Sequence, residues 1–185
     1  TLSDIHAAIE NGYYVNINYI SQQGNLNQYH IHPVRITYDT DENLYSILYF
    51  ENNQIKSLRL DFIARLSLDT RHHAPENAEM EHKLCEIAPN VWGNLFHDAP
   101  KSVKVKFYKE GRVWEKVRRD LECRTNGKLY EKNGFLYYED IVYGFSKFSN
   151  WIYGYGSSAI VIEPKWLRQR IIQSLQARKN AWKND

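Results

Sequence analysis

Between residues 13 and 69 the sequence is a series of short alternating segments separated by polar turns, and this pattern limits the possible folds more than any other feature. In YYVNINYI, Val15 and Ile17 fall on one side of an extended chain and Asn16 falls on the other. Four further strands are expected at NQYHIHPVRITY, LYSILYF, IKSLRL and SLD. In the first of these, Pro33 favours an edge position or a bend. Asp61 is expected to cap a short helical turn at residues 62–66. An amphipathic helix at residues 1–12, followed by these five strands, predicts a small β-barrel.

The sequence changes character after residue 69. TRHHAPENAE is polar and contains a proline, so residues 70–102 are expected to be a linker, with a helix at EMEHKLCEI. From residue 103 to 185 the periodicity predicts the order β-α-β-β-α-β-α, including a hairpin with Asn133 and Gly134 at its turn. We therefore predict an α+β protein with a barrel domain at 1–69, the linker at 70–102, and an α+β sandwich domain at 103–185.

Charge and composition exclude several classes of protein. A net charge of +2 over 185 residues gives no overall preference for nucleic acid, so electrostatic recognition has to be local. No stretch approaches the roughly 18 apolar residues of a membrane span, and the first residues lack a signal-peptide pattern, so no membrane partner is expected. The two cysteines, Cys85 and Cys123, belong to no paired motif, which favours a reducing compartment. A cytoplasmic protein is expected.

The sequence lacks the residue patterns typical of an enzyme. There is no glycine-rich phosphate loop, no HExxH helix and no nucleophile elbow. His82 and Cys85 are three residues apart on an expected helix, but two ligands do not make a zinc site. His72 and His73 lie in the expected linker. We therefore predict a protein that is not an enzyme and that has no cofactor and no metal.

Cationic and aromatic residues of the barrel segment are the best candidates for a binding site. His30 and His32 are two residues apart on one expected strand, so they share a face. Cations contact phosphates and aromatic rings stack on bases, so this composition suits an anionic ligand with flat bases. The alternative is that these are ordinary exposed residues on the wet face of an antiparallel sheet. The candidate residues are Tyr19, His30, His32, Tyr45, Lys56 and Arg59.

Residues 5–69 resemble a WYL domain, an Sm-like or SH3-like β-barrel found in bacterial transcriptional regulators. The motifs that carry the resemblance are AI in the first helix, VNINY, Gly24 in the turn, IHP, LYSILYF at the place of the name-giving Trp-Tyr-Leu, and LRLDFI. Residues 103–178 resemble the WCX extension that commonly follows, through SNWIYGYGSSAIVIEPKWLR. Each motif is loose by itself, but the ordered series is fairly specific.

Several positions depart from the family pattern. Leu44 and Ser46 stand where the family has Trp and Leu, and Phe62 replaces a frequent arginine. Lys56 takes a place often held by arginine, which keeps the charge but loses the bidentate fork. Strict alternation places Lys56 and Arg59 on opposite faces of their strand unless the strand bulges, so at most one is expected to enter a groove. Arg59 is the better candidate because it lies in the preserved Arg-x-Asp pattern.

The resemblance implies a regulatory function. WYL domains sense a ligand, in some cases single-stranded DNA, RNA or a nucleotide, and pass the bound state to an N-terminal winged helix-turn-helix that binds operator DNA, usually in a homodimer. No convincing helix-turn-helix pattern occurs in this sequence. As the resemblance implies, we expect the ligand-sensing and dimerisation region of such a regulator. The alternative is a stand-alone protein-interaction module, such as an accessory of a defence system.

Overall fold

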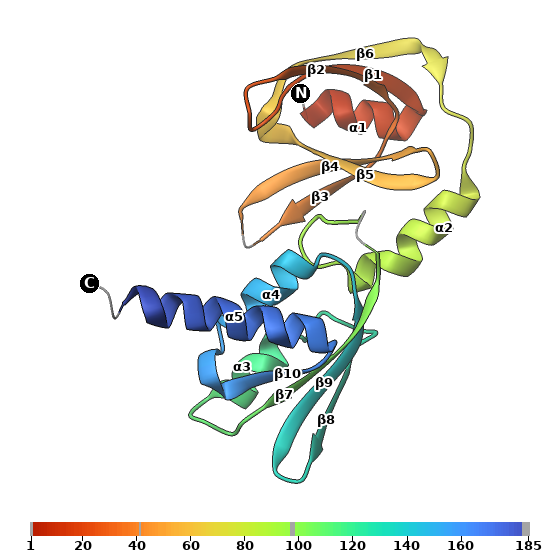
Figure 1. Cartoon of the computed structure of the whole chain (residues 1–185). Helices are drawn as coiled ribbons and strands as arrows, with labels where there is room; N and C mark the ends of the chain where they lie inside the picture. The colour runs from red at the N-terminus through yellow and green to blue at the C-terminus, as the bar shows by residue number, and fades with distance from the viewer. Residues whose placement is uncertain (1, 41, 97–98, 183–185) are drawn as a thin grey trace. The chain divides into compact units, whose positions relative to one another are not determined.

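The structure is a computed structural model that describes residues 2–40, 42–96 and 99–182 (Figure 1). The chain forms two compact units. The first comprises the described residues up to 88 together with 93–96, and the second comprises 89–92 together with the described residues from 99 onward. Both units combine helices with antiparallel sheets, so the predicted α+β class is confirmed. In these ranges no helix has the length and apolar character needed to cross a membrane.

The first unit contains two three-stranded antiparallel sheets, with strand orders β2-β1-β6 and β3-β4-β5. Its elements are α1 (Leu2–Asn11), β1 (Tyr13–Ile20), β2 (Leu26–Ile31), β3 (Pro33–Asp39), β4 (Leu44–Glu51), β5 (Gln54–Arg59), η1 (Leu60–Phe62), β6 (Ile63–His73) and α2 (Ala78–Ile87). Among the described residues, strand pairing does not join the two sheets into a closed ring. Closure into a barrel therefore stays a prediction.

The single strand expected at residues 27–38 is two strands that belong to different sheets. The chain leaves the first sheet after Ile31, and Pro33 begins β3 in the second. Proline has no backbone N–H to donate to a ladder, so it is tolerated at the first residue of a strand and disfavoured in the middle of one. The sequence indicated an edge or a bend at Pro33, but it did not indicate that the residues before and after the bend join different sheets.

The segment after β5 also differs from the prediction. A single 3-10 turn, η1, occupies Leu60–Phe62, and the residues expected to continue a helical turn already belong to β6. Leu66 and Leu68 both pack against the core, which is the two-residue period of a strand. Asp61 makes no cap; its carboxylate accepts two hydrogen bonds from Arg59. The last strand then continues to His73, well beyond the SLD segment predicted for it.

The core of the first unit is formed by α1 and the inner faces of both sheets. Ile5 and Ala8, three residues apart on α1, are fully buried. They belong to one cluster with Val15 and Ile17 of β1 and Ile47 of β4. In Figure 1 the helix lies between the two sheets. Because alternate residues of β1 are buried here, the residues between them face away from the core.

The second unit is one four-stranded antiparallel sheet with the strand order β10-β7-β9-β8. Its elements are β7 (Lys101–Phe107), α3 (Val113–Asp120), β8 (Lys128–Lys132), β9 (Phe135–Val142), α4 (Phe145–Tyr153), η3 (Gly156–Ser158), β10 (Ala159–Glu163) and α5 (Lys165–Ala181). This is the predicted order β-α-β-β-α-β-α, and the first six elements have the ferredoxin-like arrangement. Asn133 and Gly134 both adopt positive φ in the β8–β9 turn, as expected for an Asn-Gly hairpin.

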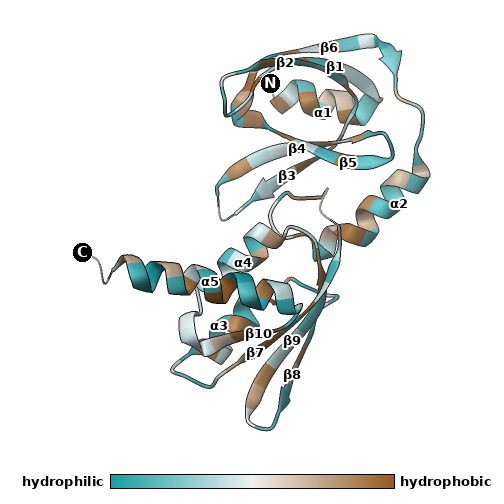
Figure 2. Ribbon diagram, viewed as in Figure 1, coloured by the Kyte–Doolittle hydropathy of each residue, from teal (hydrophilic) through white to brown (hydrophobic). Residues whose placement is uncertain are grey.

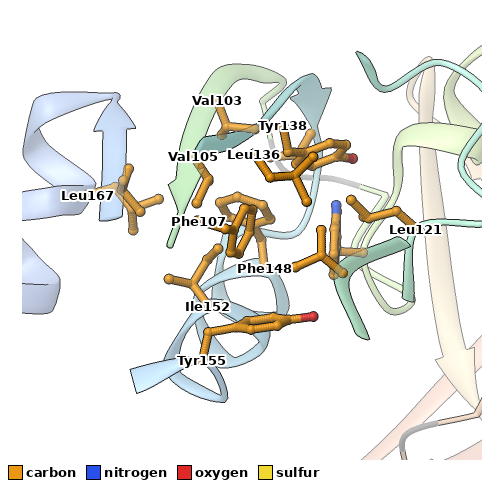
Figure 3. Close-up of a cluster of buried hydrophobic side chains, with 14 of the residues drawn as sticks. Val103, Val105, Phe107, Leu121, Leu136, Tyr138, Phe148, Ile152, Tyr155 and Leu167 are labelled. Atoms are coloured by element: carbon orange, nitrogen blue, oxygen red, sulfur yellow. The ribbon is translucent and has the colours of Figure 1, made fainter. Parts of the chain in front are cut away.

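The core of the second unit is rich in aromatic side chains. Phe107 of β7, Tyr138 of β9 and Phe148 of α4 are almost fully buried, and Figure 3 shows them converging. Leu167 packs onto the same cluster from α5. Apolar and polar residues are mixed along the strands of this sheet (Figure 2), and buried positions alternate with half-buried or exposed ones along β7 and β9. The alternation indicates that the sheet buries one face only.

Arg124 contributes to holding residues 89–92 in the second unit, together with backbone hydrogen bonds between this segment and Tyr143. Its guanidinium donates hydrogen bonds to the carbonyl oxygens of Pro89, at 3.3 Å, and Val91, at 2.9 Å. The same group lies 3.7 Å from the ring centroid of Trp92. Burial lowers the pKa of Arg124. A cation in this position ties the segment to the sheet through both hydrogen bonds and cation–π contact.

Two residues of β9 allow a direct test of the core. Leu136 is 0% exposed, whereas Ile141 on the same strand is 53% exposed. We expect Leu136→Ala to lower the free energy of unfolding by about 2–5 kcal/mol, because it leaves a cavity as well as removing buried apolar surface. Ile141→Ala is the matched control and is expected to cost about 1 kcal/mol or less. Urea denaturation of both variants measures the difference, and equal losses would contradict this assignment of faces.

Candidate ligand-binding site

Arg59 lies at the end of β5, and its position follows from the pairing of β4 with β5. In that ladder Arg59 is opposite Ser46 and Lys56 is opposite Tyr49, with no shift in register between them. Residues directly opposite each other in an antiparallel pair point to the same face. Lys56 and Arg59 therefore lie on opposite faces of the sheet, as the alternation predicts. They cannot contact one ligand group from the same side.

The guanidinium of Arg59 is held from two directions. Its Nε donates to Oδ1 of Asp61 at 3.0 Å, and its Nη2 donates to Oδ2 at 2.6 Å. Its central carbon lies 4.7 Å from the ring centroid of Phe62. The hydrogen bond with Asp61 raises the pKa of Arg59, and the same bond lowers the pKa of Asp61. The Arg59 side chain is 32% exposed, so its guanidinium is held in one orientation but remains accessible to solvent.

Aromatic rings surround this pair. Tyr19 of β1 makes edge contacts with Phe62 and with Tyr29 of β2, each at a centroid distance of 5.8 Å. Burial raises the pKa of Tyr19, whose hydroxyl also interacts with the backbone of Arg59. Tyr19 and Arg59, two of the predicted ligand contacts, are therefore neighbours in the structure. Phe62 replaces a frequent family arginine but supplies the aromatic face on which the remaining arginine rests.

Two other predicted residues are placed elsewhere. Lys56 forms an ion pair with Glu51 across the β4–β5 hairpin. Tyr45 is exposed, and its ring packs at 4.7 Å against that of Tyr38, its partner on β3. Neither makes a described contact with the pair formed by Arg59 and Asp61.

The two predicted histidines surround Tyr14. The ring of His30 stacks on Tyr14 at 4.8 Å, and the ring of His32 lies at 6.1 Å from the same tyrosine. Nδ1 of His32 is 3.0 Å from the carbonyl oxygen of Tyr13, so this nitrogen donates to the backbone. His30 instead faces Asp69, with 3.3 Å between Nε2 and Oδ2.

A cluster of His30, Asp69 and His72 is the feature that sequence reasoning missed. Nδ1 of His72 lies 2.7 Å from Oδ2 of Asp69, the oxygen that also faces His30. The Asp69 side chain is 7% exposed, whereas both histidines are well exposed. The hydrogen bond from His72, with further bonds from Arg71, lowers the pKa of Asp69 to about 2. The sequence placed His72 in a linker, and no periodicity indicated that β6 would extend to it and bring its ring to Asp69.

Family models match both parts of the chain. The WYL domain model matches residues 1–68, and the WCX domain model matches residues 99–177. The chain is a WYL domain followed by a WCX domain. Comparison with curated protein sequences finds no match. The family predicted from the sequence is thereby confirmed.

A solved structure shows a similar fold at low sequence identity. A CRISPR Cas-related protein matches with a TM-score of 0.63 and 12% identity, over 98% of this chain and 51% of its own. The proteasome accessory factor B/C (PafBC) of Arthrobacter aurescens matches with a TM-score of 0.37 and 13% identity, over 95% of this chain and 26% of its own. The chain thus spans about half or less of the structures it matches.

The WYL domain keeps only the tyrosine of its name-giving triplet. In place of the family leucine, Ser46 is buried, and its hydroxyl accepts a hydrogen bond from Nδ2 of Asn94 at 3.3 Å. Ser57 on the neighbouring strand donates to the carbonyl oxygen of the same asparagine. Where the family has an apolar leucine, Ser46 therefore makes a polar contact with Asn94. This contact lies on the same face of the sheet as Arg59.

The WCX domain has an apolar groove of about 230 Å³. Its walls come from α4, β10 and α5, and include Tyr153, Ile160, Ile172 and Leu175. Ile172 and Leu175 are three residues apart on α5 and are both exposed. The sequence indicated that α5 is amphipathic, but only the structure shows that its apolar residues border a hollow.

The contact between His72 and Asp69 leads to a prediction about the pKa of Asp69. Removing the imidazole in His72→Ala is expected to raise the pKa of Asp69 from about 2 towards its usual 3.8. Because the folded-state pKa is below the unfolded one, the cluster stabilises the fold above about pH 4 and loses this contribution as the pH falls towards 2. Carboxyl ¹³C NMR titration measures the pKa directly. His73→Ala is the control, and an Asp69 pKa unchanged in His72→Ala would contradict the assigned cause.

Proposed function

We propose that this chain is the ligand-sensing and dimerisation region of a WYL-family transcriptional regulator. Its WYL unit, an Sm-like barrel, binds an anionic ligand such as single-stranded DNA, RNA or a nucleotide. The bound state is passed to a helix-turn-helix that lies outside this chain and binds operator DNA. The region acts in the cytoplasm and catalyses no reaction. The observation that carries the proposal is the guanidinium of Arg59, oriented by Asp61 and resting on Phe62.

The orientation of Arg59 leaves donors for a phosphate. A guanidinium has five N–H groups, and Asp61 takes one on Nε and one on Nη2. The remaining three lie on Nη1 and Nη2, whose shared edge matches a phosphate in a bidentate contact. Phe62 and Tyr19 supply aromatic surface beside this edge for a base. Glu42, with its Oε2 at 4.0 Å from Nη1, lowers the positive potential there.

We expect Arg59→Ala to weaken the binding of short single-stranded oligonucleotides by about 10- to 100-fold. This range follows from the roughly 1.5–3 kcal/mol of a hydrogen bond to a charged group. Fluorescence polarisation with labelled DNA, RNA and nucleotides at low salt measures the change, since phosphate contacts weaken as salt rises. Thermal denaturation of the variant establishes that it is folded.

Two variants serve as controls in the same titration. Lys56 is about as exposed as Arg59 but lies on the opposite face of the sheet, where it pairs with Glu51. Lys56→Ala is therefore expected to change binding by about twofold or less. Glu42→Gln removes the competing charge near Nη1 and is expected to strengthen binding. Equal affinities for the parent and Arg59→Ala at low salt would exclude Arg59 as the ligand contact.

The second candidate function is that of a stand-alone protein-interaction module, and the apolar groove of the WCX domain is the observation that favours it. Within the regulator proposal, the occupant of this groove is a second copy of the chain, in a homodimer. Exposed aliphatic residues such as Ile172 and Leu175 are the kind that such an interface buries.

Leu175→Glu is expected to convert the homodimer to a monomer, because it places a charge in the apolar groove. Size-exclusion chromatography with light scattering measures the mass of each species. Gln173→Glu adds the same charge to an exposed position of α5 outside the groove lining, and this control is expected to stay dimeric. A parent that is monomeric at high concentration would contradict the homodimer and favour the interaction with another protein.

A further inference from the structure

Three side chains that can bind a metal ion meet on the outer face of the first sheet. Nε2 of His30, Oδ2 of Asp69 and Nδ1 of His72 all lie within 4.8 Å of one another. His30 comes from β2, whereas Asp69 and His72 come from β6, with β1 between the two strands. His30 is opposite Asn16 on β1 and Asp69 is opposite Tyr14, so both point to the face of β1 that is turned away from the core.

An irregularity in β6 brings His72 to this face. Tyr14 of β1 pairs with Asp69, but the preceding residue, Tyr13, pairs with His73, so residues 70–72 have no partner on β1. In a regular strand, residues three apart point to opposite faces, and His72 would lie away from Asp69. The bulge turns the chain so that Nδ1 of His72 reaches the carboxylate. Bulges commonly re-aim a side chain beside a functional site.

We propose that His30, Asp69 and His72 form a binding site for a divalent transition-metal ion of the zinc type. In a tetrahedral zinc site with bonds of about 2.0–2.1 Å, neighbouring ligand atoms are about 3.3 Å apart. The separation between Nε2 of His30 and Oδ2 of Asp69 is already 3.3 Å. Nδ1 of His72 is 2.7 Å from the same oxygen in a hydrogen bond, so binding of the ion requires a side-chain rotation that widens this separation to the spacing of a zinc site.

The surroundings of the cluster support its use as a metal site. Oδ1 of Asp69 accepts hydrogen bonds from the backbone nitrogen and Nε of Arg71, which holds the carboxylate and leaves Oδ2 for the ion. Tyr14 stacks on His30 and fixes the orientation of its ring.

The donor set also indicates which ions fit. Two imidazole nitrogens and one carboxylate oxygen suit zinc and its transition-metal neighbours, whereas magnesium and calcium prefer oxygen ligands only. Three protein ligands leave one coordination position, which faces solvent because His30 and His72 are both exposed. A water molecule or an anion can occupy that position.

The site does not rest on the proposed function, because Arg59 contributes no ligand to it. Arg59→Ala is therefore expected to bind zinc as the parent does. His72→Ala, conversely, is expected to bind oligonucleotides as the parent does in buffer freed of metal. The two proposals can thus fail separately.

Isothermal titration calorimetry of the purified chain with zinc chloride tests the site. We expect one zinc ion per chain in the parent, and affinities at least about tenfold weaker in His30→Ala and in His72→Ala. Cobalt chloride provides a second readout, because the visible absorption of Co²⁺ reports a low-coordinate site in the parent and not in these variants. Magnesium chloride is expected to give no binding.

His73→Ala is the matched control, since His73 is the adjacent exposed histidine and its Nδ1 faces the carbonyl oxygen of Asn11. His82→Ala is a second control, because His82 lies on α2, three residues before Cys85, and is not part of the cluster. Both are expected to bind zinc as the parent does. Zinc affinity that is equal in the parent and His72→Ala, or the absence of stoichiometric binding by the parent, would overturn the proposal. Circular dichroism of each variant checks the fold.

Discussion

The ladder between β1 and β6 positions both candidate sites of the WYL domain. Val15 and Ile17 bury one face of β1, and this fixes which of its residues face outward. The pairing with β6 is regular in the middle and shifts at both ends, near Tyr19 and near Tyr14. The arginine pair lies beside the first shift and the histidine cluster beside the second. Regular pairing in the middle of the ladder fixes the register of the sheet, and the irregularities at its two ends orient the side chains of the two candidate sites.

Local pairing explains how a nearly neutral chain can present cationic groups. Asp61 holds Arg59, and Glu51 pairs with Lys56. Exposed ion pairs of this kind add little to stability, but a forked arginine–carboxylate pair fixes the direction of the remaining N–H groups. The recognition that we propose for this WYL domain therefore depends on oriented donors and aromatic faces and little on the overall field, in agreement with the net charge of +2 of the chain.

Much of the secondary structure could be predicted, because it follows from local periodicity. The β8–β9 hairpin was recognisable from Asn133 and Gly134, whose positive φ angles the turn needs. Opposite faces for Lys56 and Arg59 followed from alternation, and the register has no shift there. The sequence indicated a bend at Pro33, but it missed the passage of the chain into a second sheet there and the extension of β6, because both depend on which strands pair in the folded chain.

The sequence by itself determined the α+β class, the two family domains and the identity of Arg59 as a candidate, since these rest on local patterns and motif order. Only the tertiary structure decided what surrounds those residues. Phe62, a departure from the family pattern, became the surface under Arg59. His72, expected in a linker, came to lie against Asp69 and beside His30, a residue far away in the sequence. A bulge has no periodic signature, so the contacts that it creates can be read only from the folded chain.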